Sequence, residues 1–241
     1  MNIITLKNLI NYKVQIGNIF LKKNFNNKNI IIYKIINNNC IIDLIQTSKY
    51  LLKTYILLYK ISLYNKNILF INTTNIIKNL LKKTAKLTKQ FYIIKYFKIG
   101  FFSNWNIIYN NILLLYWVET IIKLIKKQII FENLNIKNKK KIYFLYNKLY
   151  YKFKNFKGII KLPTIIFFLD LEKDNKILKE IKNLNKIIIS IVNSYNNLNF
   201  INLPIPGNNK NYYSIKLILE IITTALIQGN LKYNLLINNL N

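Results

Sequence analysis

Short apolar runs alternate along this chain with longer segments whose apolar residues recur every three or four positions. In the first half, residues 68–71 (ILFI) form a run suited to a strand that is buried on both faces. A helical pattern over residues 43–60 precedes this run, and residues 92–94 predict the next strand. A second helix is expected between the two strands, with Thr73, Thr74 or Asn75 as its N-terminal cap.

The second half repeats this alternation. Strands are predicted at residues 164–169, ending beside Asp170, at 187–192 and, in a shorter form, at 200–203. Asp174 or Asn175 is expected to cap the helix between the first two strands. A turn at residues 204–209 leads into a final helix, for which we predict Asn208 or Asn209 as the cap and Gly229 as the C-terminal stop. Strands and helices of these lengths predict an α/β fold, with a doubly wound, mainly parallel sheet flanked by helices.

A different pattern separates the two halves. A long apolar stripe begins at Trp105, and a basic segment at residues 133–141, predicted to be a turn, interrupts it. A second apolar segment then runs to about Tyr151. This pattern favours an inserted, coiled-coil-like helical hairpin, although two ordinary packing helices are an alternative. The expected organisation is therefore a basic N-terminal segment with one short helix (1–40), an α/β domain (41–104 and 156–230), the hairpin (105–155) and a C-terminal tail (231–241).

The charge is extreme for a chain with so much apolar material. The formal net charge is +29, from 37 basic residues, all lysine, and 8 acidic residues, while 52% of residues are hydrophobic. A folded protein this basic repels itself unless a polyanion neutralises it, so nucleic acid or an anionic membrane is the expected partner. Lysine and asparagine are also residues that an AT-rich genome supplies, but codon bias does not by itself explain so few carboxylates. Because the lysines are spread along the chain, nucleic acid is favoured.

Several chemistries are excluded by what the sequence lacks. There is no histidine, and the single cysteine is Cys40, so Ser-His and Cys-His catalysis, histidine metal sites and an internal disulfide are ruled out. A doubly wound nucleotide-binding enzyme is one rival, but it needs glycines after residue 71, where this chain has Asn72-Thr73-Thr74-Asn75. A peripheral membrane protein is another rival, and it requires one helix with a concentrated basic stripe. The longest apolar runs, 112–118 and 187–192, fall short of the roughly 18 residues that span a bilayer.

Four local motifs, in order along nearly the whole chain, resemble those of the bacterial-type small-subunit ribosomal protein S2 family. They are residues 41–47 (IIDLIQT), 98–105 (KIGFFSNW), 162–170 (LPTIIFFLD) and 204–209 (PIPGNN). The chain also departs from the family pattern. The family's H-F-G-H is Gln15-Ile16-Gly17-Asn18 here, its D-T-N is Asn193-Ser194-Tyr195, the second glycine of its L-G-G is Phe101, and the acidic residue after I-P-G-N is Asn209.

The resemblance implies a structural constituent of the small ribosomal subunit that binds small-subunit rRNA and neighbouring ribosomal proteins during translation. It implies no catalytic residue, metal, cofactor, membrane or small-molecule substrate. The biased composition suggests an organelle ribosome, with an AT-rich endosymbiotic bacterium as the alternative. The completeness of the family's motifs favours a plastid of the apicoplast type over a mitochondrion. Lysines then replace the counterions condensed on RNA phosphates.

Candidate RNA contacts follow from the basic segments and from the matched motifs. Trp105 and Asn104 each have an alternative role, as a packing anchor and as a helix cap, and each lysine has the alternative of a solvated face. The predicted contacts are Lys7, Lys13, Lys22, Lys23, Lys28, Lys95, Lys98, Asn104, Lys137, Lys139, Lys140, Lys141, Gly207 and Asn208.

Overall fold

The chain forms two compact units in a computed structural model that describes residues 4–19, 31–74, 76–94, 99–127, 135–171, 175–194, 196 and 198–239. Residues 1–99 and 163–241 make up one unit, here called the α/β unit, and residues 100–162 make up the other, here called the hairpin unit. The alternating pattern of the sequence is therefore folded into a single body around an inserted segment.

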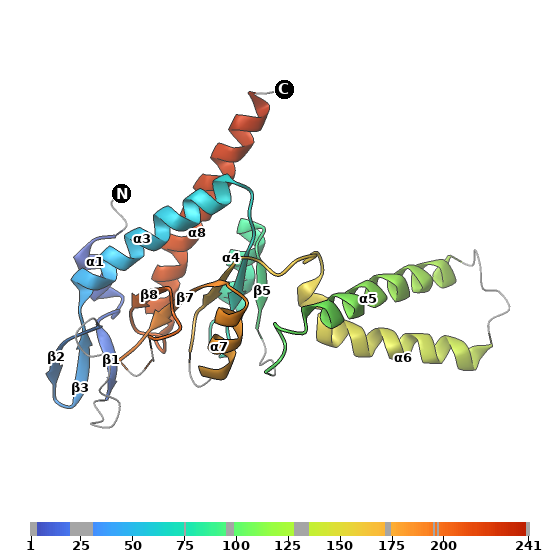
Figure 1. Cartoon of the computed structure of the whole chain (residues 1–241), viewed down its shortest axis with the longest axis horizontal. Coiled ribbons are helices and arrows are strands. Elements are labelled where there is room, and N and C mark those ends of the chain that lie inside the picture. Colours follow the sequence, from blue (N-terminus) through green and yellow to red (C-terminus); the bar gives the residue numbers. More distant parts are fainter. Residues whose placement is uncertain are drawn as a thin grey trace. The chain divides into compact units, whose positions relative to one another are not determined.

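The centre of the α/β unit is a five-stranded sheet in which every neighbouring pair is parallel (Figure 1). Its order is β5-β4-β6-β7-β8, so the chain runs outward in one direction from β4 to β5 and in the other from β6 to β8. This reversal confirms the predicted doubly wound α/β class. The strands are β4 (Ile68–Ile71), β5 (Phe91–Ile93), β6 (Ile165–Phe168), β7 (Ile187–Val192) and β8 (Leu203–Pro206).

Helices cover this sheet because its central strands are apolar on both faces. All four residues of β4 and of β6 are buried. Alternate residues of these strands, such as Phe70 and Phe167, join one large core with α3 (Leu44–Leu63), α4 (Lys78–Thr88) and α8 (Tyr212–Asn238). The rings of Phe70 and Phe167 lie 5.6 Å apart in that core. Another helix, α7 (Asn175–Asn183), packs beside β7.

The N-terminal segment contains more structure than its sequence predicted. The expected short helix is α1 (Leu6–Asn11), but a three-stranded antiparallel sheet follows in the order β1-β3-β2, from β1 (Ile16–Ile19), β2 (Ile32–Ile36) and β3 (Asn39–Ile42). Asn37 and Asn38 join β2 to β3 with φ of 46° and 62°. Asparagine tolerates this left-handed conformation, which two-residue hairpin turns require. The sequence predicts one short helix and no sheet in this region, and the basic residues 20–30 between β1 and β2 lie outside the described residues.

Two of the three expected helix caps of the α/β unit were misplaced. For the third, Asn175 is the first residue of α7 and Asp174 lies outside the described residues. The cap position of α4 is Ile77, without a side-chain hydrogen bond. Thr74 instead donates to the Asn72 side chain (3.1 Å), and Asn75 lies outside the described residues. Helix α8 is capped by Asn211, whose side chain accepts from the Tyr213 N–H (2.9 Å).

The last strand and the last helix also differ from their predicted bounds. Strand β8 covers 203–206 and not 200–203, because an edge strand tolerates Pro204 and Pro206. Helix α8 continues through Gly229 to Asn238, so Gly229 is not a helix stop. A Cβ atom at Gly229 would lie 2.6 Å from both Ser62 Cβ and the Tyr59 carbonyl oxygen of α3. This glycine therefore allows α8 to cross α3 at close range.

Candidate nucleic-acid interface

The hairpin unit consists of two long helices that pack side by side, α5 (Trp105–Lys126) and α6 (Ile136–Phe153), followed by the short helix η2 (Lys154–Phe156) (Figure 1). Leu115, Val118 and Ile122 of α5 are buried against Leu149 of α6. The apolar stripe that marked this region in the sequence is thus the seam of the hairpin.

Aromatic rings close the base of the hairpin. Phe101 contacts the rings of Phe102, Trp105 and Phe156, with centroids 5.3, 6.3 and 5.3 Å away. The Trp105 indole N–H also donates to the Ile160 carbonyl oxygen (3.4 Å). Trp105 is therefore engaged within the hairpin, as a packing anchor is.

A partly buried ion pair links α5 to the residue that follows η2. Lys157 pairs with Glu119 of α5, and its ammonium group lies 5.4 Å from the Tyr150 ring centroid. The hydroxyl of Tyr146 lies 3.5 Å from the same carboxylate. Burial, and next the negative charge of Glu119, raise the pKa of Tyr146 above its usual 10.0. The Glu119 carboxylate is therefore paired with Lys157 and Tyr146, and it does not neutralise the exposed lysines at the far end of the hairpin.

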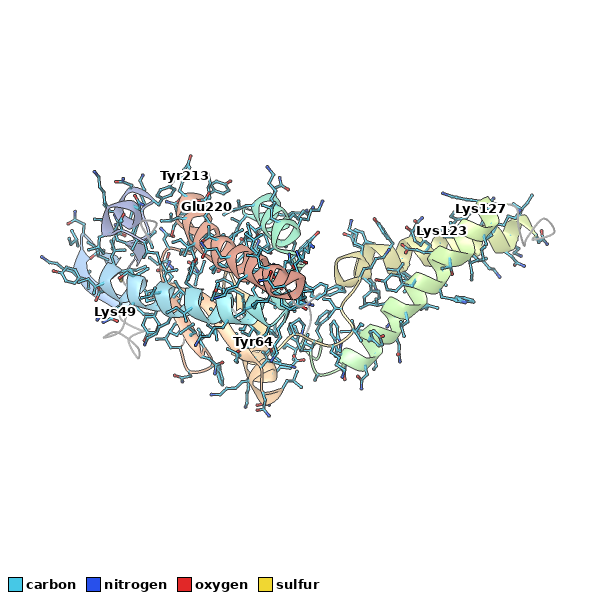
Figure 2. All side chains as sticks on the ribbon, turned by 90° about the horizontal axis from the view of Figure 1, so that it is seen from above. Lys49, Tyr64, Lys123, Lys127, Tyr213 and Glu220 are labelled. Atoms are coloured by element: carbon cyan, nitrogen blue, oxygen red, sulfur yellow. The ribbon has the colours of Figure 1, made fainter. Side chains whose placement is uncertain are left out.

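The end of the hairpin farthest from its base is strongly basic. Lysines occupy the last turn of α5 and the first two turns of α6, and all are exposed except the half-buried Lys139. Figure 2 shows Lys123 and Lys127 projecting from this end. We call this set the tip lysines: Lys123, Lys126, Lys127, Lys137, Lys139, Lys140 and Lys141.

The tip lysines have no acidic partner within the described residues. The two ion pairs found there are Glu119–Lys157 and Lys216–Glu220, neither of which involves the tip. The first turn of α6 contains no acidic residue. Lysines at a helix N-terminus also oppose the helix dipole, which favours negative charge at that position. The tip therefore carries an electrostatic cost that a bound anion would relieve.

One side of α6 combines this charge with exposed aromatic rings. Positions three or four apart place Phe144 and Tyr151 among lysines, on the side opposite the buried seam residue Leu149. Phe144 is 72% exposed and Tyr151 is 68% exposed. We call this side the α6 outer face; its members are Lys137, Lys140, Phe144, Lys148 and Tyr151. Lysines that bind phosphate and rings that stack on bases are the two components of surfaces that bind single-stranded nucleic acid.

The structure gathers only some of the predicted contact residues. Lys137, Lys139, Lys140 and Lys141 meet at the tip, although within helix α6 and not within a turn. Lys7 and Lys13 are exposed on the α/β unit, at and just after α1. Asn104 occupies the cap position of α5 and is exposed, but its side chain makes no capping hydrogen bond. The predictions at Lys22, Lys23, Lys28, Lys95 and Lys98 lie outside the described residues.

Gly207 and Asn208 lie in the interior of the α/β unit. The Gly207 N–H donates to the Val192 carbonyl oxygen (2.9 Å), and the Asn208 N–H donates to that of Val14 (3.1 Å). The Asn208 side chain accepts from the N–H groups of Lys210 and Asn211. These backbone and side-chain groups are already used to hold the turn in place.

Sequence reasoning missed Phe144, Lys148 and Tyr151 as candidate contacts. The available signal was their spacing, because aromatic residues at i and i+7 on the polar side of a helix are not needed for its core. The same spacing is visible in the sequence from Lys137 to Tyr151. The prediction of a turn up to Lys141 obscured it, since spacing along a face has meaning only once the segment is taken as helical.

The carboxyl ends of the parallel strands are where doubly wound enzymes bind their ligands. In this chain, polar side chains there bond to one another. Asn209 donates to the Asp170 carboxylate (3.0 Å) and accepts from the Asn193 side chain (3.0 Å). The Asn193 oxygen accepts in turn from the Asn18 and Ser194 N–H groups, at 3.3 and 2.7 Å. The described residues contain no group of three potential metal ligands.

Two helices are long and apolar enough in composition to cross a membrane, which the inspection of continuous apolar runs did not register. They are α5 and α8. The apolar window of α8 is 56% buried inside the α/β unit, where it packs on α3, and that of α5 is 28% buried in the hairpin. Such packing is also found for core helices, so these two helices are weak evidence for membrane insertion.

An α/β unit with an inserted hairpin, whose exposed lysines lack acidic partners among the described residues, defines a class of scaffold protein suited to a polyanion. Comparison with known proteins gives the family. Residues 9–229 match the profile of Ribosomal protein S2. The chain belongs to the ribosomal protein S2 family.

Similar proteins are named small ribosomal subunit protein uS2c or uS2. The small ribosomal subunit protein uS2c of Toxoplasma gondii is 37% identical over 96% of this chain and 99% of its own length. The small ribosomal subunit protein uS2 of Carsonella ruddii (strain PV) is 34% identical over 89% of this chain and 95% of its own. The uS2c protein of Cyanophora paradoxa is 29% identical over 79% and 80%.

Proposed function

We propose that this chain is a structural component of the small subunit of a plastid-type ribosome, where it binds rRNA through the tip lysines and the α6 outer face and catalyses nothing. The observation that carries this proposal is the set of exposed tip lysines without an acidic partner among the described residues. The plastid assignment is supported by the likeness to the uS2c proteins of Toxoplasma gondii and Cyanophora paradoxa.

The proposed mechanism is adhesion. Each lysine ammonium that meets a phosphate releases condensed counterions, so affinity falls steeply as salt rises. At the start of α6, an RNA phosphate also interacts favourably with the helix dipole. Phe144 and Tyr151 stack on unpaired bases, which adds affinity without strict sequence preference. RNA shape then determines where the hairpin binds.

Lys7 and Lys13 remain proposed as additional phosphate contacts on the α/β unit. Gly207 and Asn208 are left out of the proposed interface because both are buried and their N–H groups are bonded within the chain. The predicted contacts before the hairpin and in residues 20–30 remain proposals from the sequence alone.

The α5 side of the hairpin suits a protein neighbour better than RNA. Between Trp105 and Ile122 this helix carries no lysine, while Leu113 and Trp117 are 46% and 61% exposed. Large apolar and aromatic side chains without charge are typical of the centre of a protein–protein interface. We propose that a neighbouring small-subunit protein packs on this side.

Salt-dependent binding tests the proposed RNA interface. The triple variant K137Q/K140Q/K141Q is compared with K49Q/K53Q/K60Q, which removes the same charge from exposed positions of α3. Log affinity for a fragment of small-subunit rRNA falls as log salt rises. Losing three phosphate contacts should make this negative slope less steep by about 2. The α3 variant should retain the slope of the unmodified chain. Equal effects of the two variants would show that only net charge matters and would overturn the interface.

A further inference from the structure

A cavity of about 400 Å³, lined by both polar and apolar side chains, lies within the α/β unit. Its walls come from the connection between α3 and β4, from the end of α4 and from the second half of α8. Its size falls within the range of sites that bind small molecules. Among the described residues, no carboxylate lines this cavity, whereas pockets that bind hard cations usually contain carboxylate ligands.

The floor of the cavity is held by hydrogen bonds within the chain. The Gln90 side-chain oxygen accepts from the Ile68 N–H (2.6 Å), and the Asn230 amide donates to the Thr88 carbonyl oxygen (3.3 Å). The Asn230 oxygen is used as well, because the Ser62 hydroxyl lies 2.6 Å from it. These groups fix the shape of the cavity before any ligand arrives.

The rim offers polar groups that the fold does not use. The side chains of Asn67, Lys89 and Asn234 are exposed, line the cavity and make no hydrogen bond with the described residues. Tyr233 also lines the cavity, and its hydroxyl is held by the Asn65 side-chain amide at 3.4 Å. The cavity therefore presents two amides, one ammonium group and one positioned aromatic ring.

We propose that this cavity receives an unpaired nucleotide of RNA. A side-chain amide has a donor and an acceptor side by side and so complements the edge of a base. The Tyr233 ring provides a stacking surface, and Lys89 binds the phosphate. This inference rests on the proposed RNA-binding function but concerns a second site, in the other unit of the chain.

The test uses the full-length chain and a fluorescent hexaadenylate RNA at a fixed salt concentration high enough to suppress non-specific binding. The variant N67A/N234A removes two unused amides from exposed positions, and N106A/N110A removes two exposed asparagines from α5 as the matched control. Losing two hydrogen-bonding groups should weaken hexaadenylate binding about tenfold, while the control should change affinity less than about twofold. A hexaadenylate with one photoreactive adenine should crosslink to residues 87–90 or 227–234.

Two further arms separate the possible failures. Free AMP offers the same base and phosphate, and we expect it to bind much more weakly than hexaadenylate; equal affinity would identify a free-nucleotide site and overturn the proposal. Unchanged hexaadenylate affinity of N67A/N234A, with K137Q/K140Q/K141Q still impaired on rRNA, would remove the cavity site and leave the proposed function intact. If neither N67A/N234A nor K137Q/K140Q/K141Q differed from its control variant in RNA affinity, the proposed function itself would be rejected.

Discussion

Gly229 illustrates how one residue sets the packing of two helices. Glycine lowers helix stability by about 1 kcal/mol relative to alanine, so a glycine inside a 27-residue helix needs a compensating reason. That reason is the crossing of α8 over α3, where a side chain at this position would meet the Tyr59 carbonyl oxygen and the Leu63 backbone nitrogen. Backbone atoms cannot move aside as a flexible side chain can.

We therefore predict that Gly229→Ala destabilises the protein although alanine is the better helix former. Overpacking costs about 1–3 kcal/mol and should exceed the gain in helix propensity. Urea unfolding followed by circular dichroism measures the difference. Lys232→Ala, at an exposed position three residues further along α8, serves as the control and should change stability little. A more stable Gly229→Ala protein would refute the close crossing.

Three positions at which the chain departs from the family pattern lie close together in the structure. Asn18, Asn193 and Asn209 belong to one hydrogen-bonded network, and Asp170 provides its single carboxylate among the described residues. Neutral amides can donate and accept in the same bond chain, whereas additional carboxylates there could only accept.

Restoring the acidic residue of the family pattern by Asn209→Asp should therefore destabilise this chain. The substitution replaces the amide that donates to Asp170 by a second carboxylate oxygen, at a site where Asp170 and Asn209 are 2% and 5% exposed. The expected loss is about 1–3 kcal/mol, which thermal unfolding can detect. Asn183→Asp, at an exposed position of α7, is the control. Equal stability of the two variants would argue against a coupled network.

At the scale of helices and strands, the sequence was informative wherever burial is complete. Residues 68–71, 164–169 and 187–192 were predicted as strands because a parallel strand covered on both faces must be a continuous apolar run. Strand β2 was not predicted, since four of its five residues are exposed and its composition resembles that of a loop. The helix caps were missed for another reason, because several asparagines compete within each turn and only the tertiary fold selects one.

The hairpin was predicted as an element, but its candidate functional surface was predicted only in part. The lysines of residues 137–141 could be predicted as candidate contacts because all four lie within five consecutive residues. The exposure of Phe144 and Tyr151 depends on which side of α6 packs against α5, and that side is fixed by the seam around Leu149.

The tip should be more stable in the free protein when its charges are removed. Lysines near the first turn of α6 oppose the helix dipole and repel one another, at about 0.3–1 kcal/mol per charge in low salt. K137Q/K140Q/K141Q should therefore slow amide hydrogen exchange in α6, whereas K49Q/K53Q/K60Q should leave it unchanged. Faster exchange in the tip variant would mean that these lysines stabilise the free helix, and it would contradict a destabilisation that a bound anion relieves.

At the scale of the whole molecule, the net charge of +29 and the fold have different origins. The apolar pattern determines the sheet and the hairpin, and it would do so with far fewer lysines. The charge determines the partner, since a chain with 37 basic and 8 acidic residues repels itself in isolation. Composition and the spread of the lysines along the chain favoured nucleic acid, but ribosomal RNA in particular could be inferred only from the family's motifs and their order.

Sedimentation of an organelle lysate from the source cells tests the central proposal most directly, namely that this chain resides on small-subunit RNA. At low salt, we predict that the chain travels with small-subunit particles through a sucrose gradient. At high salt, part of it should be released, because much of its affinity comes from lysine–phosphate contacts. A chain that stays at the top of the gradient at every salt concentration would contradict this proposal.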